Sequence, residues 1–320
     1  MIRNDVNMLE ENLLATTYPH RIHYSVFGNP DGIPLLFIHG GPGAYARPEH
    51  AQFLCPQHFR IIQFDQRGCG RSLPSGSLLY NSTFYLLTDI EALRKHLGIE
   101  RWVVYGGSWG ATLALEYSKR HTNQVLALLL RGSFLGRKTD WDWFSQPDGV
   151  AQSIPEAYQQ LRTALRCKPG DDIADALHRR LFEADASTET LYRYALAWDA
   201  WESAVMGLPA PGFNPDAGVW QPRINSIRIY AYYGLHRWFL PPEGVLPGLE
   251  RIRHIPGAIV HGLQDRVCQH AGAALLAEKL PRMRLKSIEA GHGMHESVMQ
   301  QTVQQAANSL FAYLSSSKVL

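Results

Sequence analysis

The chain has few cysteines, almost no net charge and no apolar run long enough to span a bilayer. Its four cysteines, Cys55, Cys69, Cys167 and Cys268, are far apart and form no CxxC pair, which argues against a disulfide framework and a zinc site. Lysine and arginine total 31 against 29 aspartates and glutamates, so nothing favours a nucleic-acid or membrane partner. The first twenty residues lack the continuous apolar core of a signal peptide, so we expect a cytoplasmic protein.

Short apolar runs separated by helical stretches dominate much of the chain. Such alternation is typical of an α/β fold with a mostly parallel, doubly wound sheet that carries helices on both faces. The runs lie at 33–39, 59–65, 101–106, 125–132 and 257–262. Before them, a Gly-Asn-Pro-Asp-Gly turn joins the strand-like run that starts at Arg21 to the run at 33–39. We therefore expect these two runs to pair as an antiparallel hairpin at the edge of the sheet.

The alternation of strand-like runs and helical stretches stops near Gly136 and resumes near Ile255. The intervening sequence is helical in pattern, most clearly at 153–165 and 187–205, and has proline-rich connections. We expect an α/β core at 1–136 and 253–320, interrupted by a helical cap at 137–252. Six of the eight tryptophans fall in this insertion, either as the walls of an apolar pocket or as the core of a small helical unit: Trp141, Trp143, Trp198, Trp201, Trp220 and Trp238.

A Gly-Gly-Ser-Trp-Gly sequence at 106–110 follows a strand-like run and opens a helix. This is the context of a nucleophile elbow, in which a serine stands on a sharp turn above the carboxyl end of the sheet. Gly106 and Gly110 leave room for the turn and for close packing of the helix. Ser108 is thus the candidate nucleophile, and the alternative is a serine that only caps the helix.

A serine hydroxyl needs a base, and the base needs an orienting acid. Asp265 follows the late strand-like run at 257–262, and His292 follows the next one. His295 is a competing base, but the Gly-His step at His292 fits the loop apex better. The order Ser, Asp, His along the chain is that of α/β-hydrolases. The alternative is an Asp265 that forms a turn and a His292 that lies on the surface.

The sequence HGGPG at 39–43 directly follows a strand-like run and provides a candidate oxyanion hole. Glycines allow backbone N–H groups to approach an oxygen closely, and proline stiffens the loop. We assign the two donors to the N–H groups of Gly41 and Trp109, which follows the nucleophile. Without Ser108 the same segment would be read as a simple Gly-Pro turn.

Six motifs together resemble those of the proline iminopeptidase (prolyl aminopeptidase) family of α/β-hydrolase serine peptidases. They are HGGPG, DQRGCGRS at 65–72, GGSWG, WDAWE at 198–202, VHGLQDRVC at 260–268 and AGHGMHE at 290–296. The resemblance covers nearly the whole chain. It implies that Ser108, Asp265 and His292 form a catalytic triad that needs no cofactor or metal, and that Asp65 and Arg67 brace the loops around the site.

The same resemblance implies a pocket for an N-terminal proline with a free amine. A desolvated cation needs a carboxylate partner, and Glu202 matches the glutamate that binds the substrate amine in this family. Trp198, four residues earlier on the same helix face, is expected to border the proline ring. From its residue type alone, Glu202 would be read as a solvated helix residue.

At 228–233 the chain reads RIYAYY where the family typically reads Arg-Ile-Glu-Asn-His-Tyr. Tyr230 therefore replaces a second amine-binding glutamate, and a phenol carries no charge near pH 7. The first hypothesis is a serine aminopeptidase that acts on a small peptide or aminoacyl substrate with a free N-terminus. Tyr230 favours a second hypothesis, that the protein is a broader esterase or amidase. A third hypothesis is a non-catalytic binding protein, but the complete set of Ser, Asp and His argues against it.

Overall fold

The computed structural model describes residues 6–316, and within them eight strands form one sheet in the order β1-β2-β4-β3-β5-β6-β7-β8. The pairs β1/β2 and β2/β4 are antiparallel, and every later pair is parallel. The strands are β1 (Met8–Ala15), β2 (Arg21–Gly28), β3 (Ile33–Ile38), β4 (Phe59–Phe64), β5 (Trp102–Gly107), β6 (Val125–Arg131), β7 (Gly257–Gly262) and β8 (Met283–Ile288).

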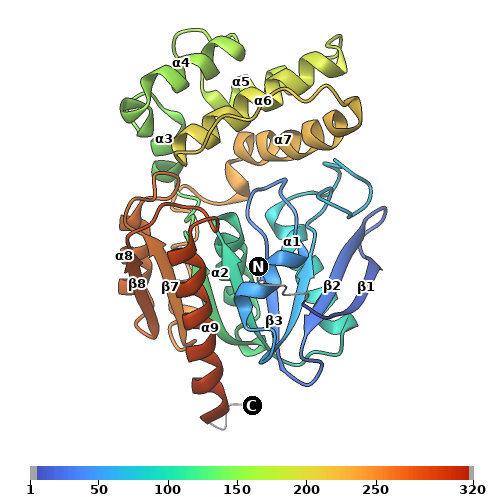
Figure 1. Cartoon of the computed structure of the whole chain (residues 1–320), viewed down its shortest axis with the longest axis vertical. Helices are drawn as coiled ribbons and strands as arrows, with labels where there is room; N and C mark the ends of the chain where they lie inside the picture. Colours follow the sequence, from blue (N-terminus) through green and yellow to red (C-terminus); the bar gives the residue numbers. More distant parts are fainter. Residues whose placement is uncertain (1–5, 317–320) are drawn as a thin grey trace.

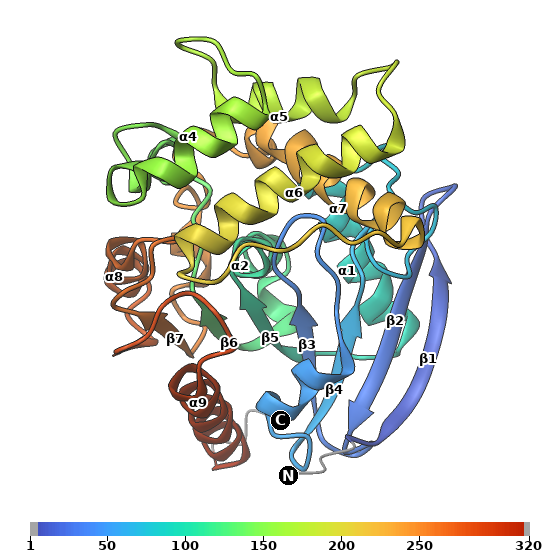
Figure 2. The same cartoon turned by 45° about the horizontal axis from the view of Figure 1, so that its top comes forward.

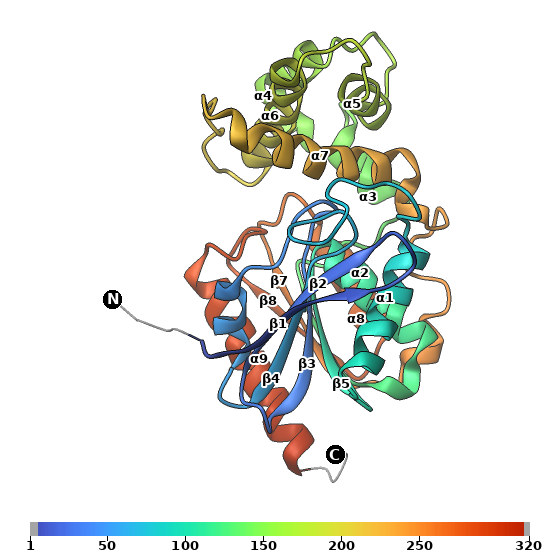
Figure 3. The same ribbon diagram turned by 90° about the vertical axis from the view of Figure 1, so that its right-hand side faces the viewer.

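Helices cover both faces of this sheet, as Figure 3 shows from the side. One face packs against α1 (Thr83–His96), α2 (Trp109–Arg120) and α8 (His270–Lys279). The other face packs against α9 (Ser297–Ser316) and the short 3-10 helix Pro48–Leu54. All residues of β5 and β7 are buried, as expected for strands covered on both sides. The predicted doubly wound α/β architecture is therefore confirmed.

The predicted hairpin between β2 and β3 is wrong, because β4 lies between these two strands. The antiparallel edge of the sheet is formed instead by β1 and β2. Strand β1 is an additional finding, because no strand was predicted before Arg21. β3 and β4 pair in parallel, so β3 lies between β4 and β5, and β2 pairs with β4 instead. β1 is mostly exposed, which suits an edge strand, whereas β2 and β3 are both largely buried and each have two neighbours.

A second layer of helices lies over the carboxyl ends of the parallel strands (Figures 1 and 2). It comprises α3 (Lys138–Ser145), α4 (Pro155–Ala164), α5 (Ile173–Leu181), α6 (Thr188–Val205) and α7 (Trp220–Leu235). The two helices expected at 153–165 and 187–205 correspond to α4 and α6. The division into core and cap at 136 and 252 stays a prediction. Within residues 6–316 no helix is long and apolar enough to cross a membrane.

Candidate active site

Ser108 lies at the turn between β5 and α2. Its φ of 56° and ψ of −122° are unusual for a residue with a side chain, and such strain persists only where the surroundings enforce it. The Ser108 N–H donates to the backbone carbonyl of Arg131 on the neighbouring strand β6, at 2.9 Å. The local geometry is therefore that of a nucleophile elbow, and Ser108 lines a cavity.

The two glycines around Ser108 are required by close backbone contacts. A Cβ atom on Gly106 would lie 2.2 Å from the carbonyl oxygen of Gly110, and one on Gly110 would lie 2.3 Å from that of Ile38. Neither distance is possible for real atoms. The helix α2 can thus begin directly against the end of β3 only because these positions lack side chains.

Asp265 and His292 follow β7 and β8 and meet above the sheet. His292 Nδ1 lies 2.7 Å from Asp265 Oδ2, and Asp265 Oδ1 accepts from the N–H groups of Val267 and Cys268 at 2.9 and 2.8 Å. Burial would raise the pKa of Asp265, but the charge and hydrogen bond of His292 outweigh it and hold this pKa below its usual value. Asp265 is therefore a carboxylate that orients the His292 ring through Nδ1, and His292 also lines the cavity.

Of the two candidate bases, His292 contacts Asp265 and His295 does not. The buried His261 also lies near this carboxylate, with Nε2 3.4 Å from Asp265 Oδ2. Arg131 fixes the loop by donating from Nη1 to the His292 carbonyl at 2.7 Å, whereas His295 is exposed on the surface. His292 and Ser108 both line one cavity of about 1180 Å³, together with Gly41 and Trp109. The structure therefore brings all the predicted triad and oxyanion residues to this one place.

Aromatic side chains form the apolar part of the cavity. Its lining includes Phe134 from the core and Trp141, Phe144 and Trp238 from the helices above. Trp141 and Trp238 contact each other with ring centroids 4.9 Å apart. The cavity that Ser108 lines therefore has a partly apolar, aromatic wall, as is typical of small-molecule pockets.

Trp198 is not among the residues that line this cavity, and its expected place beside the substrate ring stays a prediction. Its side chain is fully buried and packs behind Tyr230, with ring centroids 4.8 Å apart, and against Trp141. Trp201 is also buried, in contact with Phe144. The cap tryptophans thus serve both proposed purposes, since some fill the helical core and others face the cavity.

Glu202 lies on α6 and faces the cavity. Burial, and then the nearby charge of Asp199, raise its pKa to about 7, while Arg223 opposes the shift. Asp199 also lines the cavity, but it is paired with Arg223 of α7, whose Nε donates to Asp199 Oδ2 at 2.6 Å. Glu202 is therefore a carboxyl at the cavity wall whose pKa lies close to neutral pH.

Tyr230 faces the same cavity from α7. Burial, followed by the charge of Glu202, raises the pKa of its phenol well above the usual value, so the group is neutral. The position that holds a glutamate in the resembling family therefore adds no charge here. Asp199 and Arg223 were not identified from the sequence. Asp199 lies inside the WDAWE motif, which could have indicated that it belongs to the site. No sequence feature pointed to Arg223.

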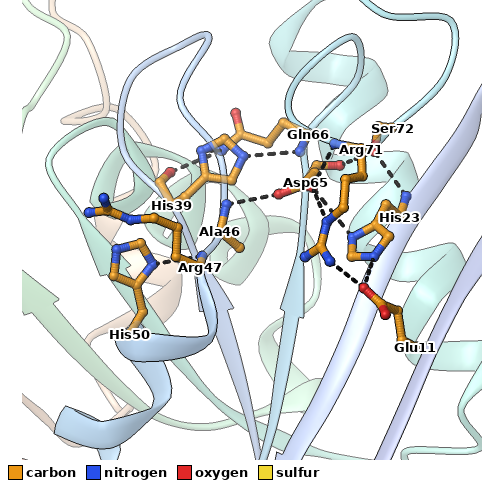
Figure 4. A network of polar contacts seen from close by, with 10 residues as sticks. All are labelled: Glu11, His23, His39, Ala46, Arg47, His50, Asp65, Gln66, Arg71 and Ser72. Carbon is orange, nitrogen blue, oxygen red and sulfur yellow. Dashed lines mark hydrogen bonds and ion pairs between the residues drawn. The ribbon is translucent and has the colours of Figure 1, made fainter. Parts of the chain in front are cut away.

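The segment 65–72 holds the loops around the cavity, as Figure 4 shows in part. Asp65 Oδ1 accepts from the N–H of Ala46 at 2.8 Å, and Oδ2 accepts from the N–H of Arg71 at 2.9 Å. Arg67 is buried and makes a two-pronged ion pair with Asp89, with Nη2 to Oδ1 at 2.7 Å. These contacts are consistent with the bracing function expected for Asp65 and Arg67.

Comparison with known proteins identifies the class. The family model described as alpha/beta hydrolase fold matches residues 33–297, so the chain is an α/β hydrolase. Among solved structures, an alpha/beta hydrolase enzyme from a deep-sea metagenome library has a TM-score of 0.64 at 15% identity, covering 94% of this chain and 97% of its own. An esterase from Rhodococcus has a TM-score of 0.59 at 18% identity, with coverage of 94% and 98%. At these identities the likeness concerns the fold alone.

Relatives with higher sequence identity identify the family within this class. The proline iminopeptidase of Neisseria gonorrhoeae is 36% identical over 296 residues, which are 92% of this chain and 94% of that protein. The proline iminopeptidase of Xylella fastidiosa is 38% identical over 299 residues, with coverage of 91% and 93%. That of Arabidopsis thaliana is 38% identical, with coverage of 87% and 73%. The chain belongs to the proline iminopeptidase family, as its six motifs indicated.

Proposed function

We propose that the chain is a serine aminopeptidase that releases N-terminal proline from peptides, amides or arylamides. The observation that carries this proposal is the shared cavity, in which Ser108 and His292 lie beside an apolar wall and the Glu202 carboxylate. Membership of the proline iminopeptidase family supports the same activity. The substrate is then a small peptide or aminoacyl compound with a free N-terminus.

In the proposed reaction, Ser108 Oγ attacks the prolyl carbonyl carbon while His292 Nε2 takes the hydroxyl proton. The carbonyl oxygen becomes an oxyanion that accepts hydrogen bonds from the N–H groups of Gly41 and Trp109. The C–N bond then breaks, and His292 gives its proton to the leaving amine. Water, deprotonated by His292, cleaves the resulting ester and restores Ser108. Asp265 stabilises the charged imidazole in both halves.

Glu202 is proposed to hold the substrate's secondary ammonium group. In the free enzyme its pKa of about 7 keeps a proton partly bound at neutral pH. A bound ammonium stabilises the ionised carboxylate and so replaces that proton. The neighbouring Asp199 adds negative potential, although its pairing with Arg223 reduces this effect.

Tyr230 favours a second candidate, a broader esterase or amidase with the same triad. Without a second carboxylate at this position, the cavity holds the amine less strongly and tolerates an uncharged acyl group better. The discriminating experiment compares hydrolysis of a prolyl arylamide with that of its N-acetylated counterpart. A strong preference for the free amine supports the aminopeptidase, and equal rates support the esterase.

We also propose that the protein works in the cytoplasm. All four of its cysteines are free thiols, and three of them, Cys55, Cys69 and Cys268, are buried. Unpaired cysteines suit a reducing compartment. Fractionation of cells that express the native gene, followed by immunodetection, tests this location.

A further inference from the structure

One buried glutamine connects the two segments that carry the proposed oxyanion donors. The side chain of Gln66 donates from Nε2 to the backbone carbonyl of His39 at 2.9 Å and accepts at Oε1 from the indole N–H of Trp109 at 2.9 Å. Its backbone N–H also donates to His39 Nε2 at 3.0 Å. Figure 4 shows the contacts with His39. Gln66 is only 2% exposed, so no solvent competes for these bonds.

The two segments that Gln66 joins come from different parts of the chain. His39 begins the loop that carries Gly41, and Trp109 is the first residue of α2, directly after Ser108. One donor of the proposed oxyanion hole therefore belongs to each segment. Their spacing must be held within about 0.5 Å for both to bind the same oxygen.

The directions of these hydrogen bonds follow from the chemistry of the partners. An indole N–H can only donate, so Gln66 must present its oxygen to Trp109 and its nitrogen to the carbonyl of His39. The imidazole of His39 accepts the Gln66 N–H at Nε2, which places the ring proton on Nδ1, where it donates to the Gly40 carbonyl at 2.8 Å. Burial lowers the pKa of His39 and keeps this neutral tautomer. The loop is thus held by the glutamine through both the backbone and the ring of His39.

We propose that Gln66 is a positioning residue that sets the distance between the Gly41 and Trp109 N–H donors. This inference rests on the proposed serine hydrolase chemistry at Ser108. Glutamine suits the task because one amide offers both a donor and an acceptor. Glutamate lacks the donor, and leucine of similar size lacks both. Gln66 is not among the residues that line the cavity, so its effect passes through the two donors.

The test is Gln66→Leu, compared with Gln63→Leu as a matched control. Gln63 is a buried glutamine of the neighbouring strand β4, and neither of its side-chain polar atoms has a hydrogen-bond partner. With a prolyl arylamide, Gln66→Leu is expected to lower kcat about tenfold or more and to change KM by less than about twofold, because misplaced donors act in the transition state. Gln63→Leu is expected to leave both constants unchanged.

Two inhibitors separate positioning from a general loss of structure. Prolinal forms a hemiacetal with the serine hydroxyl, and the oxyanion of this hemiacetal occupies the oxyanion hole. Proline, by contrast, binds only as a reaction product. In Gln66→Leu the inhibition constant for prolinal is expected to rise by about the same factor as kcat falls. The inhibition constant for proline is expected to stay within about twofold of the wild-type value. Parallel weakening of both inhibitors, or an unchanged kcat, would overturn the proposal.

Trp109→Phe gives a second test that holds even if Gln66→Leu fails to fold. Phenylalanine keeps the backbone donor and most of the ring but removes the indole N–H, so kcat is expected to fall about threefold or more at unchanged KM. The double variant should be no worse than Gln66→Leu alone, since both changes cut one connection. Full kcat in Trp109→Phe, or losses that multiply, contradicts the inference. A wild type that neither cleaves prolyl arylamides nor reacts at Ser108 would instead refute the proposed function.

Discussion

Replacing Glu202 by glutamine should lower activity and raise stability at the same time. Glutamine keeps the shape of the side chain but removes the charge proposed to pair with the substrate's ammonium. A hydrogen bond to a charged group contributes about 1.5 to 3 kcal/mol. We therefore expect kcat/KM for a prolyl arylamide to fall about ten- to hundredfold at pH 8. A neutral ester should be hydrolysed at nearly the wild-type rate.

The stability gain follows from the raised pKa of Glu202. Burial moves this pKa from 4.5 to about 7 in the folded chain. A carboxyl whose folded pKa is raised stabilises the fold while protonated, and this contribution is lost as the pH rises from about 4.5 through 7. The shift corresponds to at most about 3 kcal/mol, and partial exposure of the side chain reduces it to about 1 to 2 kcal/mol. Glutamine stays neutral, so the variant should be more stable by this amount at pH 8 and nearly equal to wild type at pH 5.

The assay combines urea unfolding at pH 5 and pH 8 with kcat/KM for a prolyl arylamide and a neutral ester. Glu189→Gln is the matched control, because Glu189 lies on the same helix α6, is exposed and pairs with Arg193. It should change neither activity nor the pH dependence of stability. If Glu202→Gln slows charged and neutral substrates alike, Glu202 is structural and the esterase hypothesis replaces the aminopeptidase. If the variant is no more stable at pH 8, the raised pKa of Glu202 is refuted.

Three further predictions concern the same cavity. A fluorophosphonate should label Ser108, and Ser108→Ala should abolish both labelling and turnover; stoichiometric labelling of another serine in digests analysed by mass spectrometry refutes the assignment. Tyr230→Glu should increase the preference for a prolyl arylamide over its N-acetylated form, measured as a ratio of kcat/KM values, and an unchanged ratio contradicts the placement of the amine. A bulky mercurial should inhibit the wild type but not Cys268→Ser, because the Cys268 N–H holds Asp265 and an adduct there displaces the triad acid; equal inhibition of both excludes this route.

Much of the fold and of the candidate site was predictable from local sequence. The apolar runs predicted buried parallel strands, and the carboxyl ends of such strands meet at one edge of a sheet. Motifs placed just after β5, β7 and β8 therefore had to come together, which is why Ser108, Asp265 and His292 could be named in advance. The glycines at 106 and 110 were predictable for the same reason, since a tight turn from strand to helix has few alternatives.

Other features depend on contacts between distant segments, which no local pattern records. The pairing of β2 with β4 instead of β3 is a contact of this kind, and so is the packing of Trp198 against Tyr230.

The amino-acid sequence by itself thus determined the class of fold, the elbow and the chain order of the proposed triad, because these arise from residues adjacent in the chain. Tertiary structure decided the raised pKa of Glu202, since this pKa depends on burial, on the neighbouring Asp199 and on Arg223 from another helix. It also decided the connection through Gln66, which joins residues 27 and 43 positions apart in the sequence. Desolvation and hydrogen-bond geometry exist only once these segments are packed together.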